Sequence, residues 1–368
     1  MGAQQVKLLR SLDNAEDRTI LAGEFARHAP EGTLQLRAFL SFTALVDHLI
    51  AKHAEDGVEG DDATALLSLL HDSSATPGKT FPTYVEEHYV RDIEAAAPQA
   101  LRFAGAVFVE ALSDEPAKEA AWVQSLADQQ APGHQWLKAM VAYAYLPDHD
   151  IDAQLATLAR FPLVKGIRQI INHHPENPGL TWPKVHSGDY LTTDEKFRHG
   201  YSLLQKYGLS FDLQVNPHQL KDAAAFVAQF PEIPVCLNHL GCLPLKEGTP
   251  EQHDALIATW REGMQALARL PHVYVKLSQL WFSKDGWEKK GSAEELLLKS
   301  LVKETLDLFT SERCMYASNF PVDKLSLTTA DMYHRYLAWN EEWGLDAKAR
   351  DDLLYATAAK FYRFNNTD

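Results

Sequence analysis

The chain has 368 residues, of which 46% are hydrophobic and 23% charged, and its formal net charge is −15. These proportions are those of a globular protein with one large domain or about two to three small ones. The acidic balance argues against a phosphate-backbone partner and against docking on anionic lipid, because both require a basic face. We therefore expect a small-molecule partner, with no nucleic acid and no membrane.

Three further features concern the compartment. No run of about 18 apolar residues is present, so no membrane-spanning helix is expected, and the first residues lack the apolar core of a secretory signal. The three cysteines, Cys236, Cys242 and Cys314, are too few for a disulfide framework. We expect a cytoplasmic protein, with a homodimer as the default oligomer.

The first part of the chain, 1–95, is rich in Ala, Leu, His and Asp and has a pattern of its own. Apolar residues at helical spacing predict amphipathic helices over 42–53 and 63–71. One short strand is predicted over Thr33–Phe39. We expect a divergent helical N-terminal region holding a candidate first barrel strand, followed by a barrel over 96–368.

From about residue 100, short apolar runs alternate with stretches of helical periodicity. The predicted strands are Leu101–Glu110, Trp136–Tyr143, Val164–Ile171, Ser210–Val215, Ile233–Asn238, Val273–Ser278 and Cys314–Ser318. The predicted helices are Pro116–Gln129, Ile151–Ala159, Asp194–Tyr207, Gln219–Ala228, Glu251–Leu270 and Ala293–Phe309. This alternation indicates βαβ units and a parallel sheet, and Thr33–Phe39 would complete a TIM (β/α)8 barrel. A doubly wound sheet is the alternative, weakened by the lack of a glycine-rich phosphate-binding motif.

Polar residues gather where the predicted strands end, and in a barrel the active site lies at that edge. They are Glu110, Arg168, His173, His218, His239, Lys276, Asn319 and Asp323. A cation buried among apolar residues is costly unless it is paired. Arg168 and Lys276 are therefore expected either to form ion pairs, with Glu110 or another carboxylate, or to bind substrate. Structural roles are also open for the rest: His239 could donate to a carbonyl, and His218 and Asp323 could cap helices.

Strand alternation places Arg168 and Gln169 on opposite faces of their strand. We expect Arg168 to face the barrel interior, because an arginine facing the helix layer would be harder to satisfy. The long segment 172–193 predicts a lid. We expect two tryptophans to form walls of a pocket: Trp182 within this segment, and Trp281 just past the predicted strand Val273–Ser278.

Several segments share their order and spacing with one family. They are GIRQII (166–171), FRHGYSLLQKYGLSFDLQVNPHQL (197–220), FPEIPVCLNHLG (230–241), VYVKLSQL (273–280), RCMYASNFPVDKL (313–325) and ATAAKFYRF (356–364). Together they resemble the amidohydrolase-related hydrolases of TIM-barrel fold, in the branch of sugar-lactone and dicarboxylate-lactone hydrolases. The resemblance implies hydrolysis of a C–O or C–N bond in a cyclic ester or amide at the barrel mouth.

The family pattern places a His-x-His on the first strand, histidines at the fifth and sixth strands, and an aspartate after the eighth. The resemblance carries over His218 and His239 as ligands of a divalent metal. The chain contains no His-x-His, and Asn319 occupies the position of the aspartate. Two protein ligands are fewer than the three or four typical of zinc. We therefore expect either no cofactor or a weakly bound divalent metal, Zn or Mn.

The resulting hypothesis is the opening of a sugar-acid or dicarboxylate lactone by water. His239 would act as the base, Arg168 would hold the carboxylate or oxyanion, and Asn319 would orient the water or the carbonyl. Asp323 could replace His239 as base if its loop turns inward. The expected substrate-binding residues are Lys276, Glu110, His173, Trp182 and Trp281. The alternatives are a catalytically inactive binding protein and a metal-dependent decarboxylase of the same superfamily.

Overall fold

The computed structural model of the chain describes residues 89–93, 101–111, 113–131, 135–182, 184–320 and 322–364. Nearly all of these residues belong to one compact unit, Asp92–Asp368. The helices predicted over 42–53 and 63–71, and the strand Thr33–Phe39, lie outside the described residues. The division at residues 95 and 96 therefore stays a prediction.

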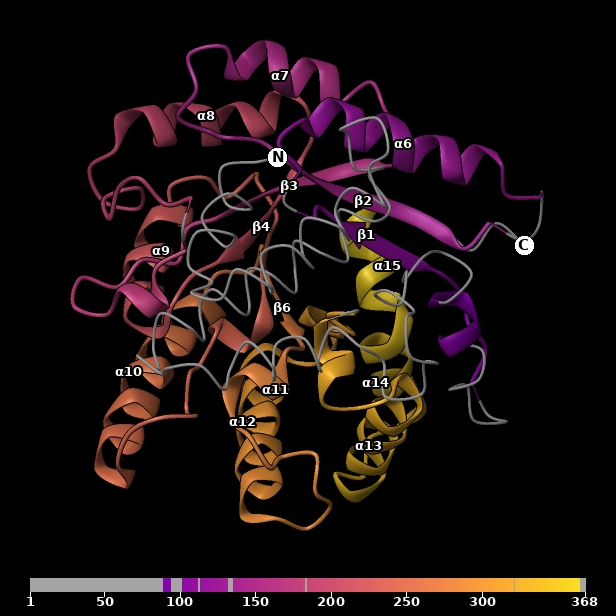
Figure 1. Cartoon of the computed structure of the whole chain (residues 1–368), viewed down its shortest axis with the longest axis vertical. Helices are drawn as coiled ribbons and strands as arrows, with labels where there is room; N and C mark the ends of the chain where they lie inside the picture. The colour runs from indigo at the N-terminus through magenta and orange to yellow at the C-terminus, as the bar shows by residue number, and fades with distance from the viewer. Residues whose placement is uncertain are drawn as a thin grey trace, which may run out of the picture. The chain divides into compact units, whose positions relative to one another are not determined.

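In the described part of the chain, seven parallel strands form one sheet in which every strand pairs with the next one. They are β1 (Ala106–Val109), β2 (Leu137–Tyr143), β3 (Val164–Ile170), β4 (Ser210–Gln214), β5 (Val235–Leu237), β6 (Val273–Leu277) and β7 (Cys314–Tyr316). The sheet curls as in a TIM barrel, with helices outside it (Figure 1). This confirms the predicted fold class. The first predicted strand, Leu101–Glu110, was too long, because pairing with β2 begins only at Ala106.

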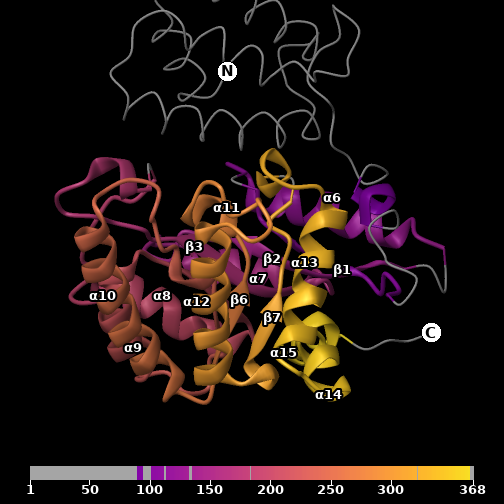
Figure 2. The ribbon, with the colours of Figure 1, turned by 90° about the horizontal axis from the view of Figure 1, so that it is seen from below.

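Helices fill the connections between the strands, as predicted, and further helices that periodicity did not predict follow β7. They are α6 (Pro116–Asp128), α7 (Ile151–Leu158), α8 (Glu195–Lys206), α9 (Leu220–Val227), α10 (Pro250–Ala268), α11 (Leu280–Ser283), α12 (Ala293–Phe309), α13 (Thr329–Glu342), α14 (Ala347–Asp351) and α15 (Thr357–Tyr362). Side-chain caps fix several starts: Asp194, Thr249 and Ser292 each accept a backbone N–H of the first turn. Figure 2 shows α10 and α12 side by side outside β6. No described helix is long and apolar enough to cross a membrane.

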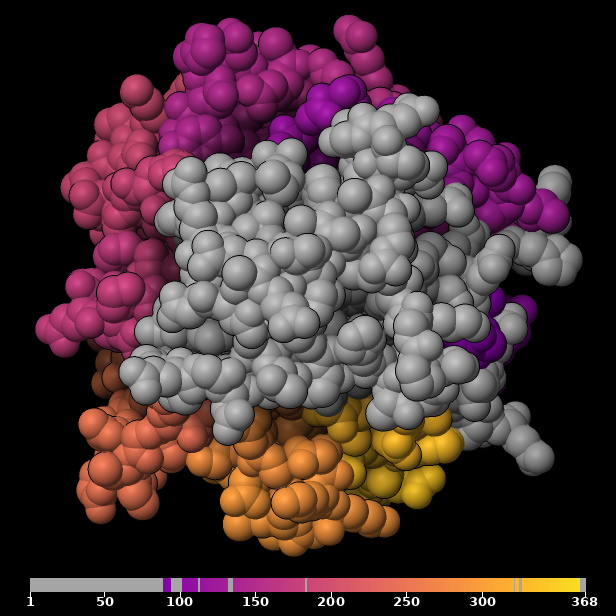
Figure 3. All heavy atoms as spheres, viewed as in Figure 1, coloured from indigo at the N-terminus to yellow at the C-terminus, as the bar shows by residue number. Residues whose placement is uncertain are grey.

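The two faces of the sheet contact different partners. Along β4, Phe211 and Leu213 pack outward in the large core shared with the helices. Cys236 on β5 and Met315 on β7 belong to a second cluster, which includes Tyr362 of α15. Since successive side chains of a strand point to opposite faces, this second cluster lies in the barrel interior, which we call the lumen. The segments follow one another around the described part of the molecule in chain order, from purple through orange to yellow (Figure 3).

Candidate active site

The backbone is strained where β5, β6 and β7 end. Among the described residues, His239, Leu240 and Cys242 after β5, Gln279 after β6 and Asn319 after β7 have φ values of 57°, 55°, 50°, 58° and 51°. Residues other than glycine rarely adopt this left-handed backbone conformation, which costs about 1–3 kcal/mol and is concentrated at functional sites. The strain therefore marks the carboxyl ends of three adjacent strands as the candidate site, which we call the mouth.

Arg168 of β3 lies at this edge with a carboxylate beside it. Its Nε donates to Glu110 Oε1 at 2.7 Å and its Nη2 donates to the Glu110 carbonyl at 2.8 Å. A longer bond, 3.4 Å, joins its Nη1 to Gln214 Oε1. Gln169 lies on the other face, where its Oε1 accepts the N–H of Leu146. Arg168 is thus held in the predicted orientation, but already as an ion pair.

A second buried ion pair lies within the lumen. Lys276 Nζ is 2.5 Å from Asp212 Oδ2, and both side chains are almost fully buried. The hydroxyl of Tyr362 lies 3.1 Å from each oxygen of Asp212. Sequence reasoning missed Asp212 and Tyr362. A lone aspartate in the apolar strand SFDLQV was a usable signal, because a buried carboxylate requires a partner.

His239 is the first residue after Asn238 at the end of β5, and it is 7% exposed. Its Nδ1 lies 2.9 Å from Ser278 Oγ, after β6. Burial, followed by the nearby positive charges of Arg168 and Lys276, holds the pKa of His239 well below its usual range. The imidazole is therefore neutral at neutral pH, and its low basicity makes it a weak proton acceptor.

Asp323 is buried next to Asn319, whose Nδ2 donates to Asp323 Oδ1 at 2.8 Å. Burial raises the pKa of Asp323 to about 7, although hydrogen bonds from Asn319 and from the backbone N–H of Gln279 oppose the rise. Gln279 follows Ser278, which contacts His239. Two consecutive residues after β6 thus contact the two predicted bases: Ser278 contacts His239, and Gln279 contacts Asp323. The structure brings together three predicted catalytic residues, His239, Asn319 and Asp323.

The two predicted metal ligands have different immediate neighbours. The ring of His218 packs edge-on against His174, with centroids 4.8 Å apart. Burial, and then the proximity of His174, lowers the pKa of His218. His239 instead faces Ser278 and two cationic side chains, an unfavourable setting for a dication. The described residues contain no group of three or more His, Cys, Asp or Glu suited to a metal ion. They do not fit the metal of the family pattern.

The segment 172–193 is fastened at its base. The Nδ2 of Asn216 donates to the carbonyl of Leu180 at 2.7 Å, and the N–H of His173 donates to Gln219 Oε1 at 3.1 Å. A Cβ on Gly188 would lie 2.7 Å from the ring of His173, so this ring packs against the segment itself. The predicted contact of His173 with substrate stays a prediction.

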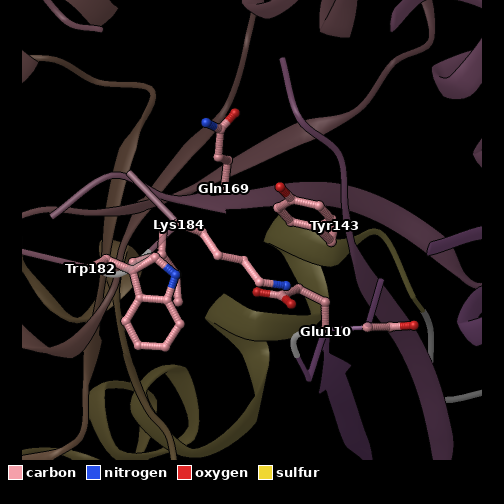
Figure 4. A pocket seen from close by; sticks show the side chains of 7 residues that line it. Glu110, Tyr143, Gln169, Trp182 and Lys184 are labelled. Carbon is pink, nitrogen blue, oxygen red and sulfur yellow. The ribbon is translucent and has the colours of Figure 1, made fainter. Parts of the chain in front are cut away.

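Trp182 of the same segment lines a small hollow beside β1 to β3. Glu110, Tyr143, Gln169 and Lys184 line it too, and the Lys184 side chain extends across it toward Glu110 (Figure 4). The hollow has room for about one water molecule. Trp182 thus lies close to Glu110 without enclosing a substrate-sized cavity.

Trp281, in α11, has its ring covered by a cation. The Nζ of Lys246 lies 3.9 Å from the ring centroid and 2.9 Å from Asp285 Oδ1. This stacking gives Trp281 a partner from its own chain. Its predicted role as a wall of the substrate pocket remains a prediction.

A parallel barrel with acid–base groups at the carboxyl ends of its strands defines the class of TIM-barrel enzymes. A family model described as amidohydrolase matches residues 41–364, so the chain belongs to the amidohydrolase family. An L-fucono-1,5-lactonase of Burkholderia ambifaria is 28% identical over 236 residues, covering 62% of this chain and 72% of the relative. Family and relative together support a hydrolase.

Two solved structures show the same fold. An amidohydrolase from Burkholderia multivorans with bound zinc has a TM-score of 0.63 and 26% identity, and the match covers 77% of this chain and 90% of that chain. A protein described as a 2-pyrone-4,6-dicarboxylic acid hydrolase from Pseudomonas putida has a TM-score of 0.55 and 19% identity. That match covers 81% and 93% of the two chains. At this identity the second likeness concerns the fold alone.

Proposed function

We propose that the protein opens a lactone ring with water, and that Asp323 moves the proton. The observation that carries this proposal is the buried carboxyl of Asp323, which Ser278 and Gln279 link to His239. A general base works best when its pKa is near the working pH, and the pKa of about 7 meets this condition. His239, with its lowered pKa, is a weaker base. The structure therefore favours Asp323 over His239 for this role.

The reaction balances with a single proton carrier. The water oxygen bonds to the lactone carbonyl carbon while one water proton passes to the Asp323 carboxylate. The ring C–O bond then breaks, and Asp323 returns the proton to the departing ring oxygen, giving a hydroxy acid. Arg168, whose Nη1 makes only a 3.4 Å bond to Gln214, is the donor for the transient oxyanion. His239 and Asn319 orient the water and the carbonyl.

The charges near the mouth favour an uncharged lactone over a dicarboxylate. Four cationic side chains there each have a carboxylate oxygen within 3.0 Å: Arg168 has Glu110, Lys276 has Asp212, Lys246 has Asp285 and Lys184 has Asp114. A substrate with two carboxylates would have to compete with these partners. The lactonase relative is named for an uncharged sugar lactone, which supports the same choice.

Turnover of a lactone panel tests the proposal. L-fucono-1,5-lactone and related aldonolactones should be hydrolysed faster than 2-pyrone-4,6-dicarboxylate, as followed by acid release. Arg168→Met should lower kcat/KM at least about tenfold, because it removes an oxyanion donor. Arg198→Met, on the outer surface of α8, is the matched control and should have little effect. Folded protein that hydrolyses no lactone would refute the proposal in favour of a binding protein.

A further inference from the structure

The end of β5 carries a buried amide that has no partner. Asn238 is 1% exposed, and among the residues that the structure describes neither its Oδ1 nor its Nδ2 has a hydrogen-bond partner. Each such group loses its hydrogen bonds to water without replacement, which makes an orphaned amide costly to bury. Native proteins rarely leave both ends of one amide in this state. The exception calls for an explanation at this position.

Its place on the strand shows which way Asn238 faces. Leu237, before it, belongs to the core shared with the helices, whereas Cys236, two residues before it, belongs to the cluster in the lumen. The N–H of Asn238 donates to the carbonyl of Leu213 at 2.8 Å, so the strand pairing continues through Asn238. Alternation then places the Asn238 side chain on the lumen side, at the mouth.

The residues beside Asn238 in the sheet show which groups surround its amide. Asp212 pairs with Cys236, and Cys236 pairs with Tyr274. Extending this register by two residues places Asn238 between Gln214 and Lys276. Lys276 is occupied by Asp212, and Gln214 faces Arg168. The amide therefore lies among the charged groups of the site and next to His239, yet contacts none of them through a hydrogen bond.

Within the described part of the chain, two more amide oxygens at the mouth lack partners. They are Oδ1 of Asn172, after β3, and Oε1 of Gln279, after β6. Like Asn238, both groups are uncharged and follow strands whose ends meet at this edge. An amide that offers one donor and one acceptor group matches a hydroxyl, which can accept and donate in turn. Neutral orphaned groups beside paired charges fit a hydroxylated, uncharged ligand better than an anion.

We infer that Asn238 is a substrate-binding residue that hydrogen-bonds a ring hydroxyl of a polyhydroxylated lactone, and thereby determines specificity. The identity of the ligand rests on the proposed function. A site built to bond a hydroxyl discriminates against analogues that lack it, because its own polar groups then stay unpaired. The unpartnered amide of Asn238 already costs stability in the folded protein, which leads to an expectation for the Tm of a variant that lacks it.

The first arm of the test measures stability without any ligand. Asn238→Leu has a similar volume and removes the orphaned amide, so the variant should melt at a Tm equal to or higher than that of the wild type. Asn340→Leu is the matched control, since Asn340 is also buried and its Nδ2 also lacks a partner among the described residues, but its Oδ1 accepts a hydrogen bond from the Tyr316 hydroxyl at 2.6 Å. Its Tm should fall. A lower Tm for Asn238→Leu would show that the amide is structural and would overturn the inference.

The second arm measures recognition. Asn238→Leu should raise KM for the hydrolysed aldonolactone about tenfold, the loss of one or two hydrogen bonds, with a smaller effect on kcat. Among monodeoxy lactones, the analogue that lacks the contacted hydroxyl should be used equally well by wild type and variant. If wild type and variant discriminate against every analogue to the same degree, Asn238 contacts no hydroxyl and the inference fails.

The third arm separates this inference from the proposed function. The alditol of the same sugar is uncharged and cannot be hydrolysed, so its binding is measured by calorimetry independently of turnover. Wild type should bind it at least about five times more tightly than Asn238→Leu. If wild type hydrolyses no lactone but keeps this difference, only the proposed function fails. Equal binding to both proteins would overturn the inference even in an active enzyme.

Discussion

On the outer face of the sheet, Phe211 and Leu213 of β4 pack against the helices in one continuous apolar core. One position along the same strand, on the inner face, Asp212 pairs with Lys276 and with the hydroxyl of Tyr362. The outer face is apolar, like an ordinary protein core. The inner face instead buries charged side chains and, among the described residues, amides that have no hydrogen-bond partner. Alternation lets one strand serve both purposes, so stability and chemistry can be altered separately.

The largest effect should come from the mouth, at Asp323. Asp323→Asn removes the proton acceptor and should lower kcat about 10²- to 10⁴-fold in a lactone assay. In the wild type, kcat should fall as the pH drops below about 7, because only the carboxylate accepts a proton. A variant within tenfold of the wild type, or a pH profile that is flat from 5 to 9, would remove Asp323 from the reaction.

The same carboxyl makes stability depend on pH. Its folded pKa of about 7 exceeds the ordinary value of 3.8, so burial favours the protonated form. Burial of the protonated carboxyl therefore contributes to the free energy of unfolding, and this contribution is fully present below pH about 4. It amounts to roughly 4 kcal/mol at most and is lost as the pH rises through about 7. Urea denaturation should show a weaker pH dependence in Asp323→Asn. Glu119, whose pKa burial also raises to about 7, keeps part of this dependence in the variant.

The next effect concerns the buried ion pair of the inner face. Lys276→Met leaves Asp212 charged and unpaired, and should lower the free energy of unfolding by about 3–5 kcal/mol in urea titrations. The double variant Asp212→Leu with Lys276→Met removes both charges and should recover most of that loss. A single variant as stable as the wild type would mean that the two side chains are not paired in the folded protein.

The outer face should behave in the opposite way. Leu213→Ala creates a cavity in the core shared with the helices and should lower the free energy of unfolding by about 2–4 kcal/mol. Its kcat, KM and pH profile should stay within about twofold of the wild type, since the substitution lies behind the site. A changed pH profile would show that the two faces are energetically coupled.

The smallest effect is expected from metal removal. The predicted ligands His218 and His239 lie in different surroundings, and His239 faces two cations. Dialysis against a chelator should therefore change lactone turnover less than about twofold. Elemental analysis provides the check: one tightly held Zn or Mn per chain, with activity lost on its removal, would assign the inner face to metal chemistry.

Periodicity of apolar residues predicted the order of the described strands and helices well, because burial on two faces leaves a strong local pattern. The ends of strands were less predictable. Leu101–Glu110 reads as one apolar run, and only pairing with β2 decides where β1 begins. The short helix α11 was not predicted, since it depends on the left-handed turn at Gln279 that precedes it.

Sequence reasoning found the polar residues of the site but could not pair them. Lys276 and Asp212 are 64 positions apart, and no local pattern shows that they meet. For Arg168 and Lys276 the sequence left two roles open, an ion pair with a carboxylate or substrate binding, and in the structure each lies beside a carboxylate. The neutrality of His239 and the pKa of Asp323 are likewise products of burial, which only the folded chain determines.

The contact between Tyr362 and Asp212 spans 150 positions. Such a contact closes a long loop, and contacts of this range form late and slowly in folding. During synthesis, β4 leaves the ribosome well before α15 does. Asp212 therefore lacks the hydrogen bond with the Tyr362 hydroxyl until α15 has been made and has packed against the sheet. The inner face reaches its final electrostatic state only when α15 docks. Growing chains should therefore acquire the barrel scaffold before they acquire the chemistry.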